Sequence, residues 1–369
     1  MNSKAMCQSI LAKAGVPINS VEPWSIQVYN EKLWDRLMSQ HQLGLGEAYI
    51  EGWWDCQAID QLVARLLDID VLSLLRPSPV VLYATFKSVV INRQTKSRAE
   101  NNAKHHYNIG NDLYSRMLDK EMAYSCAYWK NTENLNQAQI NKFDLICKKL
   151  KLEPGMTVLD IGSGWGGFLR HAVKNYHVIG YGVTPADNQI DEARARSSGF
   201  NITYTQQDYR EVFGQYDRVV SVGMMEHVGP KNLKEFFLKC NELLKQDGII
   251  LHHTITSTHS KLSTDPYFDR YIFPGGVIPS PGQICSASEK LFATEDIHNI
   301  GLHYDPTLMS WFKNINERWH EIPQYTEKFQ RMWNYYLMAS AAAFRTRNLH
   351  LMQIVFRKNG VQSEYIPVR

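Results

Sequence analysis

The amino-acid sequence predicts a doubly wound α/β fold, an open and mainly parallel sheet with helices on both faces, preceded by a smaller N-terminal domain. From residue 157 onward, short apolar stretches alternate with segments of helical periodicity, the pattern of repeated strand–helix units. A glycine-rich turn stands between the first of these strands and the next helix. With 369 residues, the chain is long enough for one large domain and one smaller one.

The expected elements follow one another along the second part of the chain. Strands are expected at 157–161, 178–183, 201–204, 216–222, 248–254 and 349–356, and helices at 135–150, 168–173, 185–198, 231–245 and 329–343. Residues 1–92 form the predicted N-terminal domain, in which a helix within the segment GLGEAYIEGWW is expected to end near Gly52. The polar segment 93–104 lacks apolar periodicity and is interpreted as a linker. The second domain is therefore expected to span 105–369.

The composition argues against several classes of protein. The net charge of +3 is too small to indicate a nucleic-acid partner, and no apolar run is long enough to predict a transmembrane helix. The first residues lack the apolar core of a secretory signal. Six scattered cysteines without a C-x-x-C pair indicate reduced thiols in the cytoplasm. His105 and His106 have no partner at metal-binding spacing, so no metal site is expected.

Positive charge is concentrated beside an apolar part of the N-terminal domain. Two segments with large apolar faces, 71–75 and 80–91, are expected to be helices. The basic residues near them, accompanied by the single acid Glu100, are Lys87, Arg93, Lys96, Arg98 and Lys104. Such a pattern suits an anionic phospholipid surface, where each cation contributes about 1 kcal/mol. A solvated linker explains the pattern equally well, and both interpretations stay open.

A cofactor site is predicted at the glycine-rich turn, Asp160-Ile-Gly-Ser-Gly-Trp-Gly. A strand, a glycine turn and a helix N-terminus direct backbone N–H groups toward a ligand. A dinucleotide fold would require G-x-G-x-x-G and an acid after the second strand. Here the spacing is G-x-G-x-G and the second strand ends at Thr184. The turn resembles motif I of the S-adenosylmethionine (SAM) methyltransferases. The sheet of these enzymes ends in a reversed strand, so the strand at 349–356 is expected to run antiparallel to its neighbours.

Further segments, spread over nearly the whole chain, resemble one family, the cyclopropane-fatty-acyl-phospholipid synthases. They are GLGEAYIEGWW, YNIGNDLYSRMLD, YSCAYW, VLDIGSGWGG, VSVGMMEHVGPKN, LHHTI and RYIFPGG. The resemblance implies methyl transfer from SAM to the cis double bond of a phospholipid acyl chain, with closure to a cyclopropane ring. It also implies a cytoplasmic homodimer, peripheral to the inner face of the membrane. The N-terminal domain, which the shorter mycolic acid cyclopropane synthases lack, would present lipid or support the dimer.

The implied chemistry needs a dry and aromatic pocket. An alkene is a poor nucleophile, and holding it against the methyl donor can supply about 7–11 kcal/mol. Methyl transfer leaves a carbocation that water would quench, and an aromatic ring can stabilise a cation by about 0.5–2 kcal/mol. Candidates for this lining are Tyr124, Tyr128, Trp129, Tyr304 and Trp311, most of which we expect to be packing residues.

Ring closure needs a base, and the resemblance implies a bound bicarbonate ion. The matching residues are Cys126, Glu226, His253, Ile255 and Tyr304. His253 and Tyr304 can donate hydrogen bonds to an anion, and Cys126 or Ile255 can offer a backbone N–H group. Glu226 is expected to hydrogen-bond through the bicarbonate hydroxyl, because two anionic groups cannot meet without a proton between them.

Neighbouring histidines are assigned different roles. His252 and His253 would face opposite sides of a strand, so only His253 is expected to reach the site. His227 is expected to be a structural partner.

Ser340 stands where some family members carry cysteine, so a thiol there is not essential if this protein is active.

The resemblance also implies the residues that bind SAM. They are Tyr124, Ser125, Asp160, Gly162, Ser163, Gly164, Gly166, Thr184, Gln189, Gln207 and Asp208. The glycine turn with Asp160 is expected at the methionine end, and Thr184 with Gln189 at the ribose. The two residues after the third strand would hold the adenine edge. Tyr124 and Ser125 would close over the sulfonium.

Two alternative functions remain open. A SAM-dependent methyltransferase acting on the same alkene could yield a methyl-branched or methylene chain, because the same cation forms and only its fate differs. A non-catalytic lipid-binding or lipid-transfer protein could retain the fold, although the intact glycine turn, Glu226 and His253 argue against it.

Overall fold

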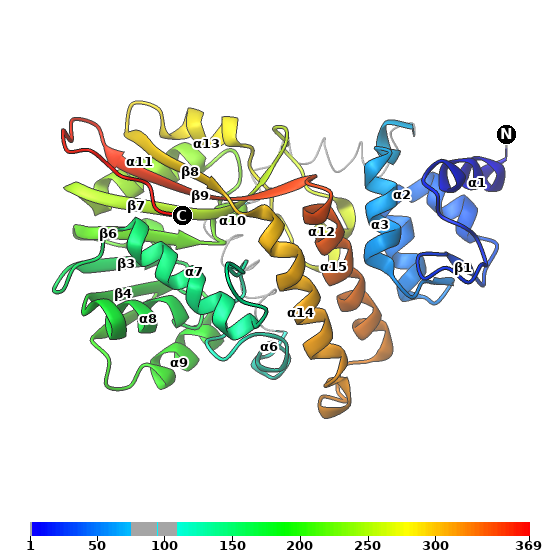
Figure 1. Ribbon diagram of the computed structural model, residues 1–369, viewed down its shortest axis with the longest axis horizontal. Helices are drawn as coiled ribbons and strands as arrows, with labels where there is room; N and C mark the ends of the chain where they lie inside the picture. The colour runs from blue at the N-terminus through cyan, green and yellow to red at the C-terminus, as the bar shows by residue number, and fades with distance from the viewer. Residues whose placement is uncertain (1, 75–93, 95–108) are drawn as a thin grey trace.

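The computed structural model describes residues 2–74, 94 and 109–369 and contains one seven-stranded sheet flanked by helices, with a helical N-terminal unit at one end (Figure 1). The strands are β3 (Thr157–Ile161), β4 (Ile179–Thr184), β5 (Ile202–Gln206), β6 (Tyr216–Val222), β7 (Leu244–Ser257), β8 (Phe292–Asn299) and β9 (Leu349–Lys358). Their order across the sheet is β5-β4-β3-β6-β7-β9-β8. The sheet changes winding direction between β3 and β6, where open α/β sheets bind their ligands.

The reversed last strand is confirmed. Strands β3 to β7 pair in parallel, whereas β9 lies between β7 and β8 and is antiparallel to both. Most strand and helix ends agree with the sequence prediction within three residues, but β7 is longer at both ends. Strand β8 was not predicted from the sequence, because its polar residues interrupt the apolar pattern.

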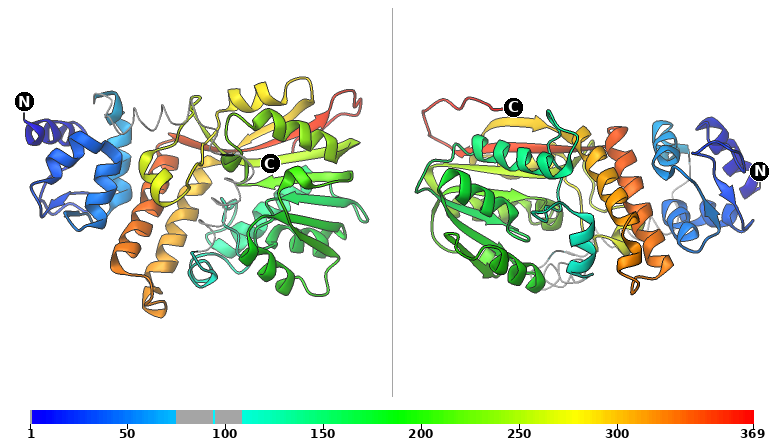
Figure 2. Two further views of the ribbon diagram at one scale, coloured as in Figure 1. Left: turned by 180° about the vertical axis from the view of Figure 1, so that it is seen from behind. Right: turned by 60° about the horizontal axis from the view of Figure 1, so that its bottom comes forward.

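Helices cover both faces of the sheet (Figure 2). One face carries α7 (Leu135–Lys149), α8 (Gly167–Tyr176) and α9 (Asp187–Arg196), and its core includes Phe143 and Phe168. The other carries α10 (Met225–Val228), α11 (Leu233–Leu243) and α13 (Pro281–Ser288), with Phe236 and Phe237 in its core. Asn134 begins α7 by accepting a hydrogen bond from the Gln137 N–H, an N-cap that typically contributes about 1 kcal/mol.

A long helical hairpin joins the sheet to the N-terminal unit. It consists of α14 (Tyr304–Asn316) and α15 (Glu327–Arg345), with α6 (Asn111–Met117) and α12 (Pro266–Tyr271) beside it. The N-terminal unit contains α1 (Ser3–Lys13), α2 (Leu33–Ile50), α3 (Ile59–Asp68) and the short strands β1 (Gln27–Val28) and β2 (Trp54–Asp55). Helices α2 and α3 pack against α15.

The contact between the N-terminal unit and α15 combines buried aromatic rings with ion pairs. Helix α2 ends at Ile50, as predicted, and Gly52 follows with a positive φ of 72°. Trp54 is fully buried and donates its indole N–H to the Leu45 carbonyl. Arg331 pairs with Asp55 at 3.0 Å and Arg345 with Asp60 at 2.7 Å. The N-terminal unit is therefore packed against α15 through buried side chains and ion pairs.

Several sequence interpretations fall on residues that the structure does not describe. These are the expected helix at 80–91, the linker at 93–104 except Gln94, the five basic residues near it, and the pair His105 and His106. The expected helix at 71–75 appears in part, as a short 3-10 helix at Val71–Leu74. Within the described residues, no helix is both long and apolar enough to cross a membrane.

Candidate active site

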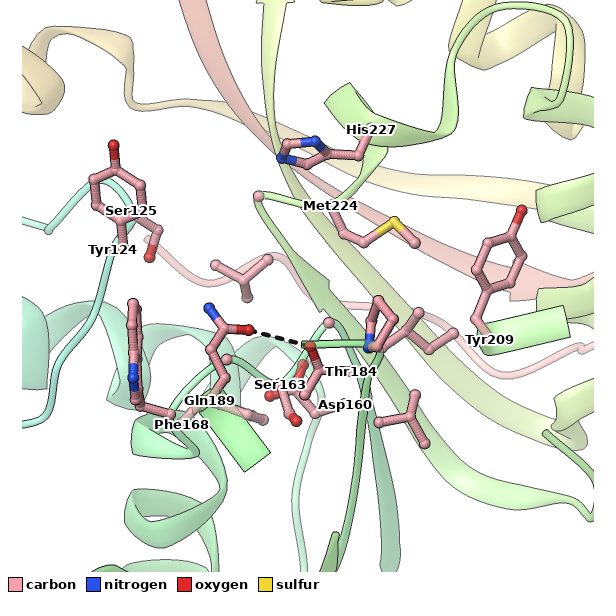
Figure 3. A pocket seen from close by; sticks show the side chains of 18 of the residues that line it. Tyr124, Ser125, Asp160, Ser163, Phe168, Thr184, Gln189, Tyr209, Met224 and His227 are labelled. Carbon is pink, nitrogen blue, oxygen red and sulfur yellow. Dashed lines mark hydrogen bonds between the residues drawn. The ribbon is translucent and has the colours of Figure 1, made fainter. Parts of the chain in front are cut away.

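A pocket opens at the carboxyl ends of β3, β4, β5 and β6 (Figure 3). Its lining includes the glycine turn and the residues that directly follow β4, β5 and β6. All of the predicted SAM-binding residues except Gly166 line it: Tyr124, Ser125, Asp160, Gly162, Ser163, Gly164, Thr184, Gln189, Gln207 and Asp208. The structure therefore gathers at one site residues that the sequence scatters over 85 positions, from 124 to 208.

The glycine turn brings backbone close to the pocket. Gly162 and Gly164 have φ values of +85° and +53°, which disfavour a side chain. A Cβ at Gly162 would lie 3.0 Å from the Met224 side chain. The N–H groups of Gly162 and Ser163 both donate to the Val183 carbonyl, so neighbouring β4 holds the turn in place.

Gly166 has a different role from the one predicted. It precedes α8 with a φ of +79° and does not line the pocket. A Cβ there would overlap the Tyr204 hydroxyl, which donates to the Gly166 carbonyl at 3.4 Å. Glycine is therefore needed at this position for the close packing of the turn against β5.

We expect Gly166→Ala to destabilise the protein far more than Gly164→Ala. Both substitutions place an alanine in the left-handed backbone conformation, which costs about 1–3 kcal/mol. Only the first adds overpacking, which typically costs about 1–3 kcal/mol more, because nothing lies within 4 Å of a Cβ at Gly164. Urea denaturation of both variants measures the difference. Equal losses would show that Tyr204 moves aside freely.

The pocket has polar groups suited to several parts of a nucleoside ligand. The Thr184 hydroxyl donates to Gln189 at 3.1 Å, where a dinucleotide fold would place an acid. Asp208 pairs with Arg210 at 3.1 Å. Asp160 is buried, burial raises its pKa to about 7, and its Oδ1 atom has no hydrogen-bond partner among the described residues. An unsatisfied buried carboxylate oxygen in a pocket indicates a ligand donor.

Glu226 occupies the position next to this pocket. It lies in α10, directly after β6, and its Oε1 atom accepts the Ile255 N–H at 2.6 Å. Its Oε2 atom is buried without a hydrogen-bond partner among the described residues. Burial raises the pKa of Glu226 to about 7. The Ile255 N–H, which we expected to face an anion, is thus already used by the carboxylate.

His253 and Cys126 are both buried and neutral. His253 contacts Gln353 through Nδ1 at 3.3 Å, and its Nε2 atom has no partner within the described part of the chain. Burial, with Lys142 nearby, lowers the pKa of His253 well below its usual value. Burial likewise raises the pKa of the Cys126 thiol, which donates to the Ala127 carbonyl at 3.3 Å. Cys126 is therefore no thiolate nucleophile.

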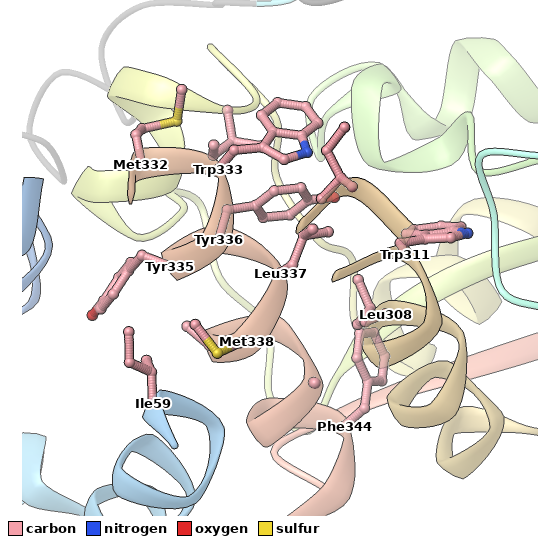
Figure 4. Close-up of a cluster of buried hydrophobic side chains, with 14 of the residues drawn as sticks. Ile59, Leu308, Trp311, Met332, Trp333, Tyr335, Tyr336, Leu337, Met338 and Phe344 are labelled. Atoms are coloured by element: carbon pink, nitrogen blue, oxygen red, sulfur yellow. The ribbon is translucent and has the colours of Figure 1, made fainter. Parts of the chain in front are cut away.

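Tyr304 is the first residue of α14 and belongs to a cluster of buried hydrophobic side chains on the helical hairpin. Figure 4 shows other members of this cluster, among them Trp311, Tyr336 and Phe344. The Tyr304 ring lies 4.4 Å from Phe344 and 6.0 Å from Trp311, and Trp311 lies 5.2 Å from Tyr124. The Tyr124 and Tyr336 hydroxyls are 2.7 Å apart. The structure thus brings together three of the five rings proposed as a lining. The sequence analysis missed Tyr336 and Phe344, although both lie on the apolar face of α15.

The other two proposed rings are packing residues, as expected for most of the set. Tyr128 packs on His303 with ring centres 4.9 Å apart. Trp129 donates its indole N–H to Thr307 at 2.9 Å. Ser340 is buried within α15.

The two adjacent histidines face opposite sides of β7, as predicted. His252 packs among Phe236, Phe237 and Phe356, whereas His253 faces the side of the sheet that α7 covers, near Lys142 and Lys149, and does not itself line the pocket. His227, which was expected to be a structural partner, lines the pocket (Figure 3). Burial lowers the pKa of His227 to about 4, so its ring is neutral.

Lys142 and Gln94 also line the pocket and were missed from the sequence. Lys142 is fully buried on α7 and donates to the Ser125 hydroxyl at 2.8 Å. The spacing of Leu135, Ala138, Lys142 and Lys149 places both lysines on the buried stripe of this helix, which was the available signal. Among the residues placed in the structure, no group of three or more metal-ligating side chains is found.

Comparison with known proteins identifies the family of this chain. The family model described as mycolic acid cyclopropane synthetase matches residues 94–354. The cyclopropane-fatty-acyl-phospholipid synthase of Escherichia coli strain K12 is 44% identical over 359 residues, which cover 97% of this chain and 94% of that protein. A probable fatty acid methyltransferase of Pseudomonas putida is 36% identical over 68% of this chain and 67% of its own length.

Solved structures give the same assignment. The mycolic acid cyclopropane synthase CmaA1, complexed with S-adenosylhomocysteine (SAH) and CTAB, superposes with a TM-score of 0.67 at 30% identity, over 70% of this chain and 98% of that one. Coclaurine N-methyltransferase, at 20% identity and a TM-score of 0.70 over 85% of this chain and 99% of its own, shares the fold. The chain belongs to the mycolic acid cyclopropane synthetase family of SAM-dependent methyltransferases.

Proposed function

We propose that the protein transfers the methyl group of SAM to the cis double bond of unsaturated acyl chains in membrane phospholipids and closes a cyclopropane ring. The observation that carries this proposal is the buried carboxylate of Glu226, with one unpartnered oxygen beside a pocket suited to SAM. The name of the E. coli relative, 44% identical over almost the whole chain, supports the same reaction.

The residues present fit SAM. The unpartnered Oδ1 atom of Asp160 can accept from an ammonium group, and the open space at Gly164 leaves room for a ligand. Thr184 and Gln189 stand where a ribose hydroxyl would bind, and Gln207 and Asp208 would hold the adenine edge. When bound, SAM supplies an electrophilic methyl group. A related protein, CmaA1, was solved with SAH, the product of methyl loss.

The residues present also fit a bicarbonate ion as the base for ring closure. Both Glu226 Oε2 and His253 Nε2 are buried polar atoms without partners in the described chain. Neutral His253 can donate one hydrogen bond to an anion, and the carboxylate of Glu226 can accept the bicarbonate hydroxyl. With the Ile255 N–H engaged, Cys126 offers the remaining backbone N–H, and Tyr304 completes the set. When bound, bicarbonate supplies the proton acceptor.

The surrounding rings keep the reaction dry. Tyr124 and Trp311 bury their faces beside the site, and an aromatic face stabilises a nearby carbocation by about 0.5–2 kcal/mol. The cluster also excludes water, which would add to the cation and divert it from ring closure.

The protein is proposed to act as a homodimer at the cytoplasmic surface of the membrane. The basic residues between 87 and 104 would contact anionic headgroups, and the N-terminal domain would present lipid or support the dimer. Vesicle sedimentation with and without anionic lipid tests the contact with headgroups. Binding that is electrostatic should need the anionic lipid and should weaken as the salt concentration rises.

The decisive experiment incubates the protein with methyl-labelled SAM and vesicles of a cis-unsaturated phospholipid, followed by gas chromatography and mass spectrometry of the fatty acids. A labelled cyclopropane chain is the expected product. A labelled methyl-branched or methylene chain would establish the alternative methyltransferase reaction. SAH and lipid binding without any labelled product would favour a non-catalytic lipid-binding protein.

Depletion of bicarbonate provides a separate test of the base. In buffer freed of carbon dioxide, we expect the rate of cyclopropane formation to fall by about 100-fold, the lower end of the range of general-base contributions. Added bicarbonate should restore it. An unchanged rate would assign the proton transfer to the protein itself, with Glu226 as the first candidate.

A further inference from the structure

Lys142 is a charged group inside the molecule that the proposed mechanism does not use. Its side chain is 1% exposed and lines the pocket from α7. Within the described part of the chain, its ammonium donates a hydrogen bond to the Ser125 hydroxyl, at 2.8 Å. No carboxylate among the described residues forms an ion pair with it. Its ammonium lies over the Phe143 ring at 4.3 Å, and the buried carboxylates of Asp119 and Asp160 act on it from a distance without bonding to it. Its charge is therefore directed, through Ser125, toward the pocket.

The bond between Lys142 and Ser125 fixes the direction of the serine hydroxyl. An ammonium group can only donate, so Ser125 Oγ must accept this hydrogen bond. The serine O–H is then left to donate elsewhere, and Ser125 itself lines the pocket. The adjacent positive charge strengthens that donor. The pair therefore forms a donor suited to an anionic acceptor.

Asp160 presents the opposite charge to the same pocket. Its Oδ1 atom lacks a partner within the described residues, and Lys142 is the cation that offsets its burial. Asp119, the other buried acid near Lys142, is already occupied by the N–H groups of Glu121 and Ala123. Ser125 and Asp160 lie on different walls of the cavity (Figure 3). The pocket thus carries an anion-binding and a cation-binding group.

We propose that Lys142 is a positioning residue that acts through the Ser125 hydroxyl to bind the carboxylate of the cofactor's amino-acid end, while Asp160 binds its ammonium group. This inference rests on the proposed use of SAM. Lys142, which lies outside the glycine turn, would then cause the pocket to bind a zwitterionic ligand more tightly than a ligand that lacks the carboxylate.

The test compares SAH with its decarboxylated analogue, 5′-deoxy-5′-(3-aminopropylthio)adenosine, by calorimetry. The wild-type protein should bind SAH about 10- to 100-fold more tightly, the usual effect of one charge-assisted hydrogen bond. Lys142→Met should lose most of this preference by weakening SAH alone. Ser125→Ala should do the same, and the double variant should bind SAH no more weakly than Lys142→Met, because the two residues act as one unit.

Lys149→Met is the matched control. Lys149 lies on the same helix and is equally buried, but it pairs with Asp296 and does not line the pocket. This variant should keep the wild-type preference even though it loses stability. If Lys142→Met weakens both ligands equally, or retains the preference for SAH, the inference is wrong while SAM binding stands. If the wild-type protein binds neither ligand, the proposed cofactor itself is wrong, and this inference with it.

Discussion

Glu226→Gln is expected to reduce cyclopropane formation by at least about 100-fold, the scale of general acid–base contributions, while the affinity for SAH changes little. Glutamine keeps the shape of the side chain and can still accept the Ile255 N–H through its carbonyl oxygen. It replaces the unpartnered Oε2 atom with an NH₂ group, which cannot accept a hydrogen bond. Turnover on vesicles and calorimetry with SAH separate the two effects.

Asp217→Asn is a matched control for Glu226→Gln. Asp217 also accepts a backbone N–H from a neighbouring strand, that of Thr157 at 2.8 Å, but it lies at the opposite end of β6. Its loss should lower stability without changing turnover per folded molecule. Near-normal turnover of Glu226→Gln would exclude the carboxylate from the chemistry.

The pH dependence of the wild-type enzyme follows from the same carboxylate. Burial raises the pKa of Glu226 from 4.5 to about 7, so its ionised form is lost as the pH falls below about 7. Measured at fixed bicarbonate concentration, turnover should fall with it, and this inflection should be absent in Glu226→Gln. The same pKa shift changes the stability of the folded protein in the opposite direction to turnover. The folded state retains the proton longer, so this group's contribution to stability decreases as the pH rises from 4.5 toward 7.

A large loss of stability is expected for Asp296→Ala, at about 3–5 kcal/mol, the usual cost of removing one partner of a buried ion pair. Asp296 lies in β8 and accepts from Lys149 of α7 at 3.0 Å, with side chains 3% and 0% exposed. Burial already lowers the pKa of Lys149 to about 8, and without Asp296 its charge would be uncompensated. Urea denaturation measures the change.

Lys149→Met should cost less than Asp296→Ala, because Asp296 keeps its second partner, Arg369. The double variant should be more stable than the sum of the two single losses indicates, since it buries no uncompensated ammonium. A loss below about 1 kcal/mol for Asp296→Ala, the level of an exposed pair, would show that Lys149 reaches solvent.

The sequence by itself determined the fold and the location of the cofactor site. Both rest on local periodicity and turn chemistry, which neighbouring residues dictate. The alternation of strands and helices, the G-x-G-x-G turn and the absence of an acid after Thr184 all lie within short segments. The same local rule placed His252 and His253 on opposite faces of β7, because side chains alternate along a strand. Strand β8 could not be predicted from its own residue pattern, because its pairing with β9 holds it in the sheet.

Only the tertiary structure decided which groups face one another. Local pattern could put Lys142 on the buried stripe of α7, but Ser125 across from it is 17 residues away. Likewise, the Ile255 N–H meets Glu226 across 29 residues, and Gly166 meets Tyr204 across 38. Such pairs depend on how α7 packs near Ser125, how β5 lies against the glycine turn, and how β7 lies beside α10. Partners, and hence the charge and hydrogen-bonding state of each site residue, therefore become defined only when distant segments pack together.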